Sequence, residues 1–173
     1  LSIRRQRQMC IRDSPTAAFI ASKGIKVTGV DVNAAFVESI NRGEVPFVEP
    51  GFDVMLKKVV DKGLLVAQSK QIEADAYIVC VPTPFADDYK VDTKYINAAV
   101  EAMAPHLRPG ALVVLESTSP PGTTEAMAKH IVELRPDLSL DEDAENAIFV
   151  AHCPERVLPG RIMEEMESND RVI

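Results

Sequence analysis

The alternation of apolar and polar positions along the chain predicts strands separated by helices. Five short apolar runs, each bounded by glycine, proline or polar residues, are of strand length: 25–32, 64–67, 74–81, 111–115 and 146–151. Apolar residues recur at helical spacing in the intervening segments 34–41, 52–61, 92–107 and about 124–134, and the small residues of 15–22 also favour a helix. Strands that alternate with helices predict an α/β fold with a doubly wound, mostly parallel sheet.

The apolar run 111–115 leads directly into a series of hydroxyl side chains, which reads ESTSPPGTT over 116–124. A continuous apolar run of this length is typical of a parallel strand that is buried on both faces. In open α/β sheets, ligands bind outside the carboxyl ends of the strands. We therefore expect the hydroxyls after this strand to lie in a ligand site.

Composition and charge narrow the classes of function. The chain has 173 residues, enough for about one domain, and its formal net charge of -7 argues against nucleic acid as a partner. No apolar run approaches the roughly 18 residues of a membrane span and no secretory signal is recognisable, so we expect a cytoplasmic protein that does not enter a membrane. Cys10, Cys80 and Cys153 are widely spaced and predict neither a disulfide framework nor a metal site.

An acidic residue stands at the end of the first predicted strand. The order of a helix at 15–22, Gly24, a strand and then Asp31 is typical of the second part of a dinucleotide-binding βαβ unit. The Asp31 carboxylate would accept hydrogen bonds from the adenosine ribose hydroxyls and repel a ribose 2′-phosphate, which predicts NAD rather than NADP. The alternative is that Asp31 caps the helix that starts near Ala34.

Further candidates stand at the ends of other strands. Thr83, between two prolines, could donate a hydrogen bond to a bound ligand, or the segment could be only a rigid turn. Thr123 or Thr124 could cap the next helix and direct its N–H groups toward an anionic cofactor, or could serve capping alone. Glu155 could hold or deprotonate a water and Arg156 could pair with a phosphate or carboxylate, the alternative being a surface ion pair.

Taken together, these motifs resemble the nucleotide-sugar 6-dehydrogenases over roughly residues 15–173. The resemblance is carried by Asp31 and by the stretches Asn41-Arg42-Gly43-Glu44, Glu49-Pro50-Gly51, Val81-Pro82-Thr83-Pro84, Glu116-Ser117-Thr118-Ser119-Pro120-Pro121-Gly122-Thr123-Thr124 and Cys153-Pro154-Glu155-Arg156-Val157-Leu158-Pro159-Gly160. Each motif is short, but their common order is specific. Glu116 and the pair Arg156-Val157 favour an N-acetylated substrate, because the enzymes for UDP-glucose tend to have lysine and Phe-Leu there.

The resemblance implies a Rossmann-like NAD-binding domain and a four-electron oxidation used in polysaccharide biosynthesis. The 6-hydroxyl of UDP-N-acetyl-D-mannosamine would become a carboxylate while two NAD are consumed. By similarity, the residues that contact NAD would be Asp31, Thr83, Ser117, Thr118 and Thr124. Thr118 and Glu155 would act on the catalytic water, and the UDP-sugar would be bound by Glu155, Arg156 and Val157. The resemblance also implies that the full-length parent is a homo-oligomer.

The beginning of the chain departs from the family pattern. The family opens with three glycines before Leu-Pro, and when Pro15 is taken as that proline, the glycine positions are occupied by Gln8, Cys10 and Asp13. Side chains there would fill the phosphate cradle, and Asp13 would add a negative charge against the pyrophosphate. We interpret residues 1–14 as a non-native or disordered arm, with a native basic arm as the alternative. Residues 15–173 would then be an incomplete NAD-binding domain whose first strand and glycine-rich loop are missing or replaced.

Two catalytic residues of the family also have no counterpart in this chain. The family carries its lysine and its nucleophilic cysteine downstream of the motifs found here, and Cys153 lies in the wrong motif to replace that cysteine. We therefore expect the chain to be inactive alone. The alternatives are a part of another UDP-sugar 6-dehydrogenase, such as one for UDP-glucose, and a non-catalytic nucleotide-binding module.

Overall fold

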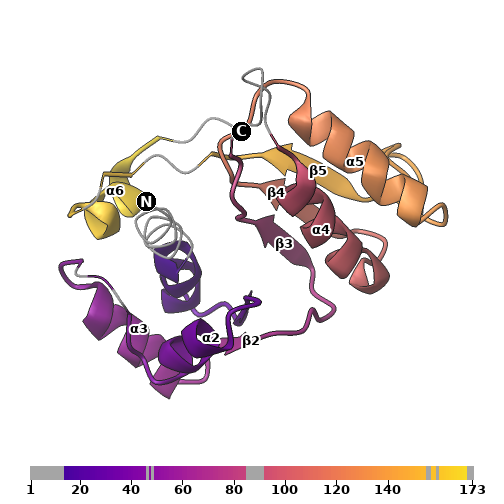
Figure 1. The fold of residues 1–173 in the computed structure, drawn as a ribbon. Helices are drawn as coiled ribbons and strands as arrows, with labels where there is room; N and C mark the ends of the chain where they lie inside the picture. Colours follow the sequence, from indigo (N-terminus) through magenta and orange to yellow (C-terminus); the bar gives the residue numbers. More distant parts are fainter. Residues whose placement is uncertain are drawn as a thin grey trace. The chain divides into compact units, whose positions relative to one another are not determined.

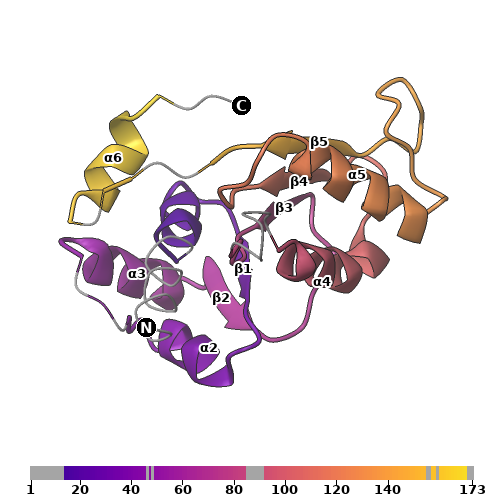
Figure 2. The same cartoon turned by 45° about the horizontal axis from the view of Figure 1, so that its top comes forward.

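The structure is a computed structural model, and it describes residues 14–45, 47, 49–84, 92–154, 157–158 and 160–170. The chain forms two compact units. The first comprises residues 1–70 and 156–170, and the second comprises residues 71–155 and 171–173 (Figures 1 and 2).

The first unit is built on a two-stranded parallel sheet. In this sheet β1 (Val27–Val30) pairs with β2 (Leu65–Gln68). The helical segments of this unit are residues 14–22, α2 (Ala34–Asn41), α3 (Phe52–Asp61) and α6 (Ile162–Ser168). Along the chain, α2 and α3 lie between β1 and β2, whereas α6 comes from the far end of the sequence (elements labelled in Figure 2).

Helix α3 illustrates how local sequence forms this unit. Its Phe52, Leu56 and Val59 are spaced by four and three residues, so they share one helical face, and all three are at most 2% exposed. Gly51 precedes the helix with a φ of 78°, a left-handed conformation that glycine adopts without steric cost. The Phe47 ring stacks on Phe52 at a centroid distance of 5.5 Å. The segment that enters α3 is thereby anchored in the core of the unit.

The second unit contains a three-stranded parallel sheet in the order β3-β4-β5. The strands are β3 (Ala76–Val79), β4 (Leu112–Leu115) and β5 (Phe149–His152). The connections contain α4 (Lys94–Met103), the 3-10 helix η2 (Ala104–His106) and α5 (Thr123–Leu134). Most of the buried apolar residues described in this unit form one cluster, in which Val113 and Leu115 of β4 are completely buried with Val100 of α4 and Ile131 of α5.

The two faces of the β3-β4-β5 sheet differ in burial although both are apolar. Tyr77, Val113 and Leu115 point to the face that packs in the cluster. Residues of the opposite face, Ile78 and Phe149, are 43% and 46% exposed. The expectation that the run 111–115 is buried on both faces is therefore wrong for the described residues, because helices cover only one of them.

The strand orders explain why two sheets are found where one was predicted. A doubly wound sheet of this class has the order 3-2-1-4-5-6, with its first strand in the middle. The orders β2-β1 and β3-β4-β5 are those of its second to sixth strands. No strand within the described residues corresponds to the first strand of that order, and the prediction that this strand is missing or replaced stays a prediction. Residues 1–13, on which that prediction falls, lie outside the described residues.

The predicted boundaries hold better for helices than for strands. Helices α2 and α3 have the predicted bounds, and α5 ends at Leu134 as expected. Strand β2 keeps the predicted length but is shifted by one residue, and the other four strands are shorter than predicted. Strand β5 begins at Phe149 rather than Asn146, and Ala147 lies in an isolated bridge with Ser139. The predicted helix 92–107 is divided into α4 and η2. Helix α6 has no counterpart among the predicted elements.

Arg135 joins the end of α5 to the segment after α4. Its Nη1 atom donates hydrogen bonds to the carbonyl oxygens of Ala104 (2.6 Å) and Leu107 (3.0 Å), and Nη2 donates to Asp137 Oδ2 (2.6 Å). The hydrogen bond from Arg135 is the main cause that lowers the pKa of Asp137 below its usual 3.8. Because this pKa is lower in the folded state, the pair stabilises the fold above the usual carboxyl pKa, and the contribution is lost as the pH falls through the lowered value.

We therefore expect Asp137→Asn to lower the urea midpoint slightly at pH 7, since the carboxylate is exposed. The difference between the variant and the unmodified chain should disappear at a pH below the lowered pKa of Asp137. Urea unfolding at a series of pH values measures this difference in midpoint. Glu142→Gln, at an exposed carboxylate, is the control. A difference that stays constant at all pH values would contradict this assignment.

Candidate active site

The carboxyl end of β1 carries the predicted ribose ligand, Asp31. Its Oδ1 atom accepts a hydrogen bond from the backbone N–H of Asn33 at 2.8 Å, which forms a tight turn after the strand. Asn33, and not Asp31, is the N-cap of α2, because its side chain accepts from the N–H groups of Ala35 and Phe36. The capping alternative for Asp31 is therefore wrong. A carboxylate has a second oxygen that can accept further hydrogen bonds, and Asp31 is half-buried at the strand end.

The carboxyl ends of β3 and β4 are joined by hydroxyl groups. Ser117 Oγ accepts a hydrogen bond from the N–H of Val81 and donates to the Val81 carbonyl oxygen, both at 2.8 Å. Thr83 Oγ1 donates to the carbonyl oxygen of Thr118 at 2.7 Å. The structure thus brings together three residues that the sequence predicts to contact NAD. Thr118 itself is exposed at this end of the sheet.

The hydrogen bonds of Ser117 give it a structural role in addition to any contact with a ligand. Ser117→Ala would leave the Val81 N–H without its acceptor, and we expect a loss of about 1 kcal/mol in the free energy of unfolding. Chemical denaturation followed by circular dichroism measures this loss. Ser119→Ala is the matched control, because it removes a hydroxyl from the same loop without affecting Val81. Equal stabilities of the two variants would show that the Ser117 bridge contributes nothing.

The turn before α5 differs from the predicted capping by threonine. Gly122 is the N-cap residue, with a φ of 87° and no side-chain cap hydrogen bond. Thr123 is buried, and its hydroxyl donates to the Pro120 carbonyl oxygen at 2.8 Å. Capping by Thr123 or Thr124 is therefore wrong, because the turn already places the first helical residue at Thr123. Thr124 lies half-buried in the first turn of α5, and its contact with NAD stays a prediction.

A thiol and a carboxylate meet where β3 and β4 end. Cys80 Sγ lies 2.8 Å from Glu116 Oε2, and Glu116 is only 7% exposed. Glu116 is the residue whose type favours an N-acetylated substrate by resemblance, whereas no role was predicted for Cys80. Only the parallel register that sets Val79 beside Leu115 brings these two residues together. Cys80 stands one residue after the end of β3, and Glu116 stands one residue after the end of β4. This matching position is the signal in the sequence that could have identified Cys80.

The segment after β5 carries the predicted substrate residues. Glu155 and Arg156 lie outside the described residues, and Val157 is half-buried in the first unit. The neighbouring N–H groups of this segment are bound by two buried carboxylates, Glu49 and Glu165. Sequence reasoning assigned no role to either, although Glu49 belongs to a family motif. Asp31 and Val157 belong to the first unit, whereas Thr83, Ser117, Thr118 and Thr124 belong to the second.

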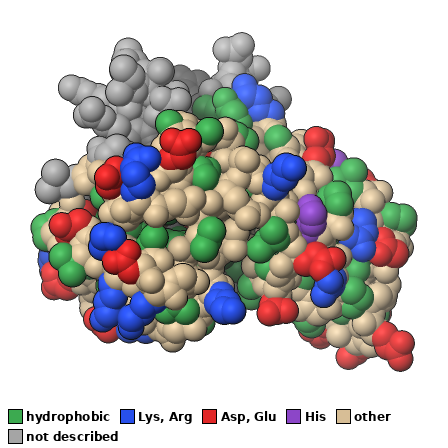
Figure 3. Space-filling view, turned by 90° about the horizontal axis from the view of Figure 1, so that it is seen from below, with side chains coloured by type: hydrophobic (Ala, Val, Ile, Leu, Met, Phe, Trp, Pro, Cys, Tyr) green, Lys and Arg blue, Asp and Glu red, His purple; other side chains and the backbone are tan. Residues whose placement is uncertain are grey.

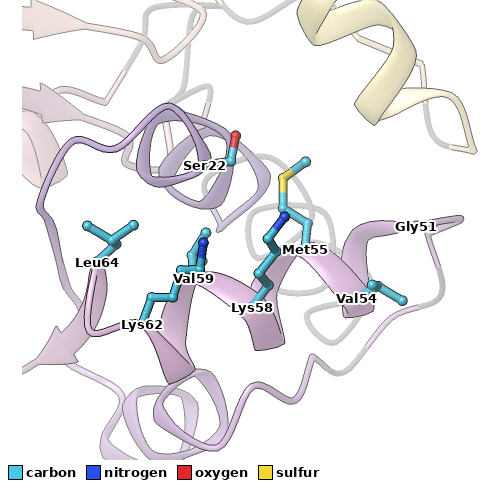
Figure 4. Close-up of a pocket in the computed structure, with 8 residues that line it drawn as sticks. All are labelled: Ser22, Gly51, Val54, Met55, Lys58, Val59, Lys62 and Leu64. Carbon is cyan, nitrogen blue, oxygen red and sulfur yellow. The ribbon is translucent and has the colours of Figure 1, made fainter.

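A pocket of about 320 Å³ lies in the first unit, away from the carboxyl end of β1 that carries Asp31 (Figure 4). It is lined by Ser22, Gly51, Val54, Met55, Lys58, Val59, Lys62 and Leu64. Leu64 directly precedes β2, so the pocket lies at the amino end of that strand, whereas Asp31 follows the carboxyl end of its parallel neighbour. We therefore do not assign the predicted binding of NAD or UDP-sugar to this pocket.

The described residues offer neither a metal site nor a membrane-spanning helix. In Figure 3, acidic and basic side chains are interspersed over the face shown. No group of three or more His, Cys, Asp or Glu residues suitable for a metal ion occurs within the described part of the chain. None of the helices in that part is long and apolar enough to cross a membrane.

Comparison with known proteins identifies the family to which this chain belongs. A family model described as the UDP-glucose/GDP-mannose dehydrogenase family, NAD binding domain, matches residues 14–173. A UDP-N-acetyl-D-mannosamine dehydrogenase of Yersinia pestis is 52% identical over 161 residues, which cover 92% of this chain and 38% of that protein. An NDP-N-acetyl-D-galactosaminuronic acid dehydrogenase of Ralstonia nicotianae is 47% identical, again over 161 residues and with the same coverage.

Solved structures give the same result for the fold. The UDP-N-acetyl-mannosamine dehydrogenase of Staphylococcus aureus matches with a TM-score of 0.82 and 33% identity, over 91% of this chain and 37% of that one. GDP-mannose dehydrogenase from Pseudomonas aeruginosa, at 23% identity over 88% of this chain and 36% of that one, supports the fold alone with a TM-score of 0.77. The predicted Rossmann-like α/β fold is thereby confirmed. The chain spans about 38% of the length of the curated relatives it matches.

Proposed function

The chain belongs to the UDP-glucose/GDP-mannose dehydrogenase family, and from this premise we propose that it is the NAD-binding part of a UDP-N-acetyl-D-mannosamine 6-dehydrogenase. The observation that carries the proposal is the 52% identity to such an enzyme over nearly the whole chain. The overall reaction would convert the primary 6-alcohol and one water into a carboxylate. Two NAD would accept the two hydrides, and three protons would be released.

The described residues fit one part of an NAD site. The Asp31 carboxylate at the end of β1 suits the two ribose hydroxyls, since one of its oxygens is used by Asn33 and the other can accept. Thr83, Ser117 and Thr118 suit the remaining part of the cofactor at the ends of β3 and β4. NAD supplies the hydride acceptor when it is bound, and the role of these side chains is to hold the reacting groups in position.

The residues proposed to act on the sugar follow β4 and β5 in the sequence. Thr118 and Glu155 would hold the catalytic water, and Glu155, Arg156 and Val157 would bind the UDP-sugar. An arginine suits the diphosphate of this substrate because its planar guanidinium donates paired hydrogen bonds. Residues 1–14 would contribute no phosphate loop in this proposal, since glycine is absent from them. The proposal also includes a cytoplasmic location and homo-oligomeric assembly of the full-length parent.

The experiment is an activity assay on a hybrid enzyme. Residues 15–170 of this chain replace the aligned stretch of the Yersinia pestis relative, which supplies all other parts. We expect the hybrid to reduce two NAD for each UDP-N-acetyl-D-mannosamine consumed, as measured by absorbance at the NADH band and by product analysis. A folded hybrid without activity, or one that prefers UDP-glucose, would contradict the proposal.

A second candidate substrate is an N-acetylated UDP-sugar of the galacto series. It is favoured by the 47% identity to the Ralstonia nicotianae enzyme, which is only slightly lower than that to the first relative. The same hybrid discriminates the two, because kcat/KM can be measured for both sugars. A higher kcat/KM for the galacto sugar would replace the proposed substrate without changing the reaction.

A further inference from the structure

Two buried carboxylates hold the backbone of the segment after β5. Leu158 N–H donates to Glu165 Oε2, and the N–H groups of Gly160 and Ile162 donate to Oε2 and Oε1 of Glu49, all at 2.8 Å. Residues 157, 158 and 160–162, which we call the clamped segment, directly follow Glu155 and Arg156 in the sequence. Three of its N–H groups are thus bound by carboxylates that come from two other parts of the first unit.

The burial of these carboxylates shows that the contacts are built into the unit. Glu49 is 6% exposed and Glu165 is 8% exposed. A buried carboxylate is costly unless hydrogen bonds compensate for its lost hydration. Both oxygens of Glu49 are used on the clamped segment, across 111 and 113 residues of sequence. Glu165 Oε1 additionally lies 3.9 Å from Arg161 Nη1.

The side chains around both carboxylates are fixed by packing. Phe47 and Phe52, which flank Glu49 in the sequence, stack on each other, and Phe52 is completely buried. On the other side, Ile162 and Met166 bury one face of α6 next to Glu165. The described N–H groups of the clamped segment are therefore bound by two carboxylates whose own surroundings are well packed.

We propose that Glu49 and Glu165 are positioning residues for the sugar-nucleotide site, which they serve by fixing the backbone that carries Val157. This inference rests on the proposed function, in which Val157 binds the UDP-sugar. Substrate groups must be held within a fraction of an ångström for efficient reaction, so substrate-binding residues need a second set of contacts that locks them. Hydrogen bonds from N–H groups to a charged carboxylate are stronger than those between neutral groups and are suited to this task.

The two hydrogen bonds of Glu49 can be tested by one conservative substitution. Glu49→Gln keeps the size of the side chain but replaces one acceptor oxygen by an NH2 group, which would then face a backbone N–H. One of the two hydrogen bonds must be lost, and the segment should move. We expect KM for UDP-N-acetyl-D-mannosamine to rise about tenfold, the loss expected for one hydrogen bond to a charged group. KM for NAD should change less than about twofold, because no proposed NAD contact lies in the clamped segment.

The test uses the hybrid enzyme with Glu49→Gln, Glu165→Gln and a matched control. Glu38→Gln is the control, because it makes the same chemical change in α2 of the same unit at a side chain that is 73% exposed. Steady-state kinetics with each substrate varied separates the two KM values, and thermal denaturation reports folding. An unchanged sugar KM in folded Glu49→Gln and Glu165→Gln, or equal increases in both KM values, would overturn the inference.

Failure of this inference can be distinguished from failure of the proposed function. An inactive hybrid without any of these substitutions would contradict the proposed function. An active hybrid whose sugar KM does not respond to Glu49→Gln would contradict only the positioning role. If Glu49→Gln fails to fold, Glu165→Gln decides, because it makes the acceptor of the Leu158 N–H neutral and so weakens that hydrogen bond, while it leaves both hydrogen bonds of Glu49 in place. Loss of folding in both variants would show that the carboxylates serve the whole fold, and the inference would be wrong.

Discussion

Replacing Ile131 with alanine is expected to lower the free energy of unfolding by about 2–5 kcal/mol. Ile131 lies in α5, is completely buried, and belongs to the apolar cluster that joins α4 and α5 to the β3-β4-β5 sheet. The substitution removes buried methyl and methylene groups and leaves a cavity that close-packed neighbours cannot fill. Since a domain is typically stable by only about 5–15 kcal/mol, this single change would remove a large part of the total.

The matched control is Leu134→Ala, three residues further along the same helix. Leu134 is 42% exposed, so the same kind of deletion removes much less buried surface. Urea unfolding followed by circular dichroism measures both variants, and the midpoint of Ile131→Ala should fall far below that of the control. Equal midpoints would show that α5 does not pack on the sheet as described.

Replacing Asp31 with alanine is expected to weaken NAD binding by the hybrid enzyme by a factor of about 10 to 100. Each hydrogen bond from a ribose hydroxyl to the charged carboxylate contributes about 1.5–3 kcal/mol, and tenfold in affinity corresponds to about 1.4 kcal/mol. The change also removes the acceptor of the Asn33 N–H, which defines the turn after β1. Isothermal titration calorimetry with NAD and NADP measures the two affinities.

Asp31→Asn separates these two roles. The asparagine Oδ1 can still accept from Asn33, so the turn is kept, while the negative charge that would repel a ribose 2′-phosphate is removed. We expect this variant to gain NADP binding relative to NAD without losing stability. If NAD and NADP bind to it in the same ratio as to the unmodified hybrid, Asp31 does not face the ribose.

The sequence predicted those parts of the fold that depend on local pattern. The bounds of α2 and α3 follow from capping, glycine and an apolar face, and these signals lie within each helix or directly beside it. Helix α6 was not predicted because Glu165 is one of its buried residues. In the sequence, a glutamate indicates an exposed polar position and therefore interrupts the apolar pattern. The exposed face of the β3-β4-β5 sheet could not be predicted either, since an apolar residue such as Ile78 does not reveal which helices will cover it.

The candidate site was predictable where it lies at strand ends and not where it depends on distant contacts. Thr83 and Thr118 could be expected to meet, because parallel strands end at the same edge of a sheet. The contact between Glu49 and Ile162 spans 113 residues, and no local pattern indicates which N–H groups a buried glutamate will bind. Resemblance pointed to the motif that contains Glu49, but only the structure gives this side chain a partner.

The central claim is that residues 15–170 carry part of an NAD site and that residues 1–14 do not supply its phosphate loop. The most direct measurement is calorimetric titration with NAD of two proteins: the 173-residue chain, and the same chain with residues 1–14 replaced by the opening segment of the Yersinia pestis relative. A third protein, in which the glycines of that segment are alanine, is the control. We predict saturable binding only for the second protein, because bare backbone must approach the pyrophosphate. Equal binding by all three proteins, or none by the second, would contradict the account.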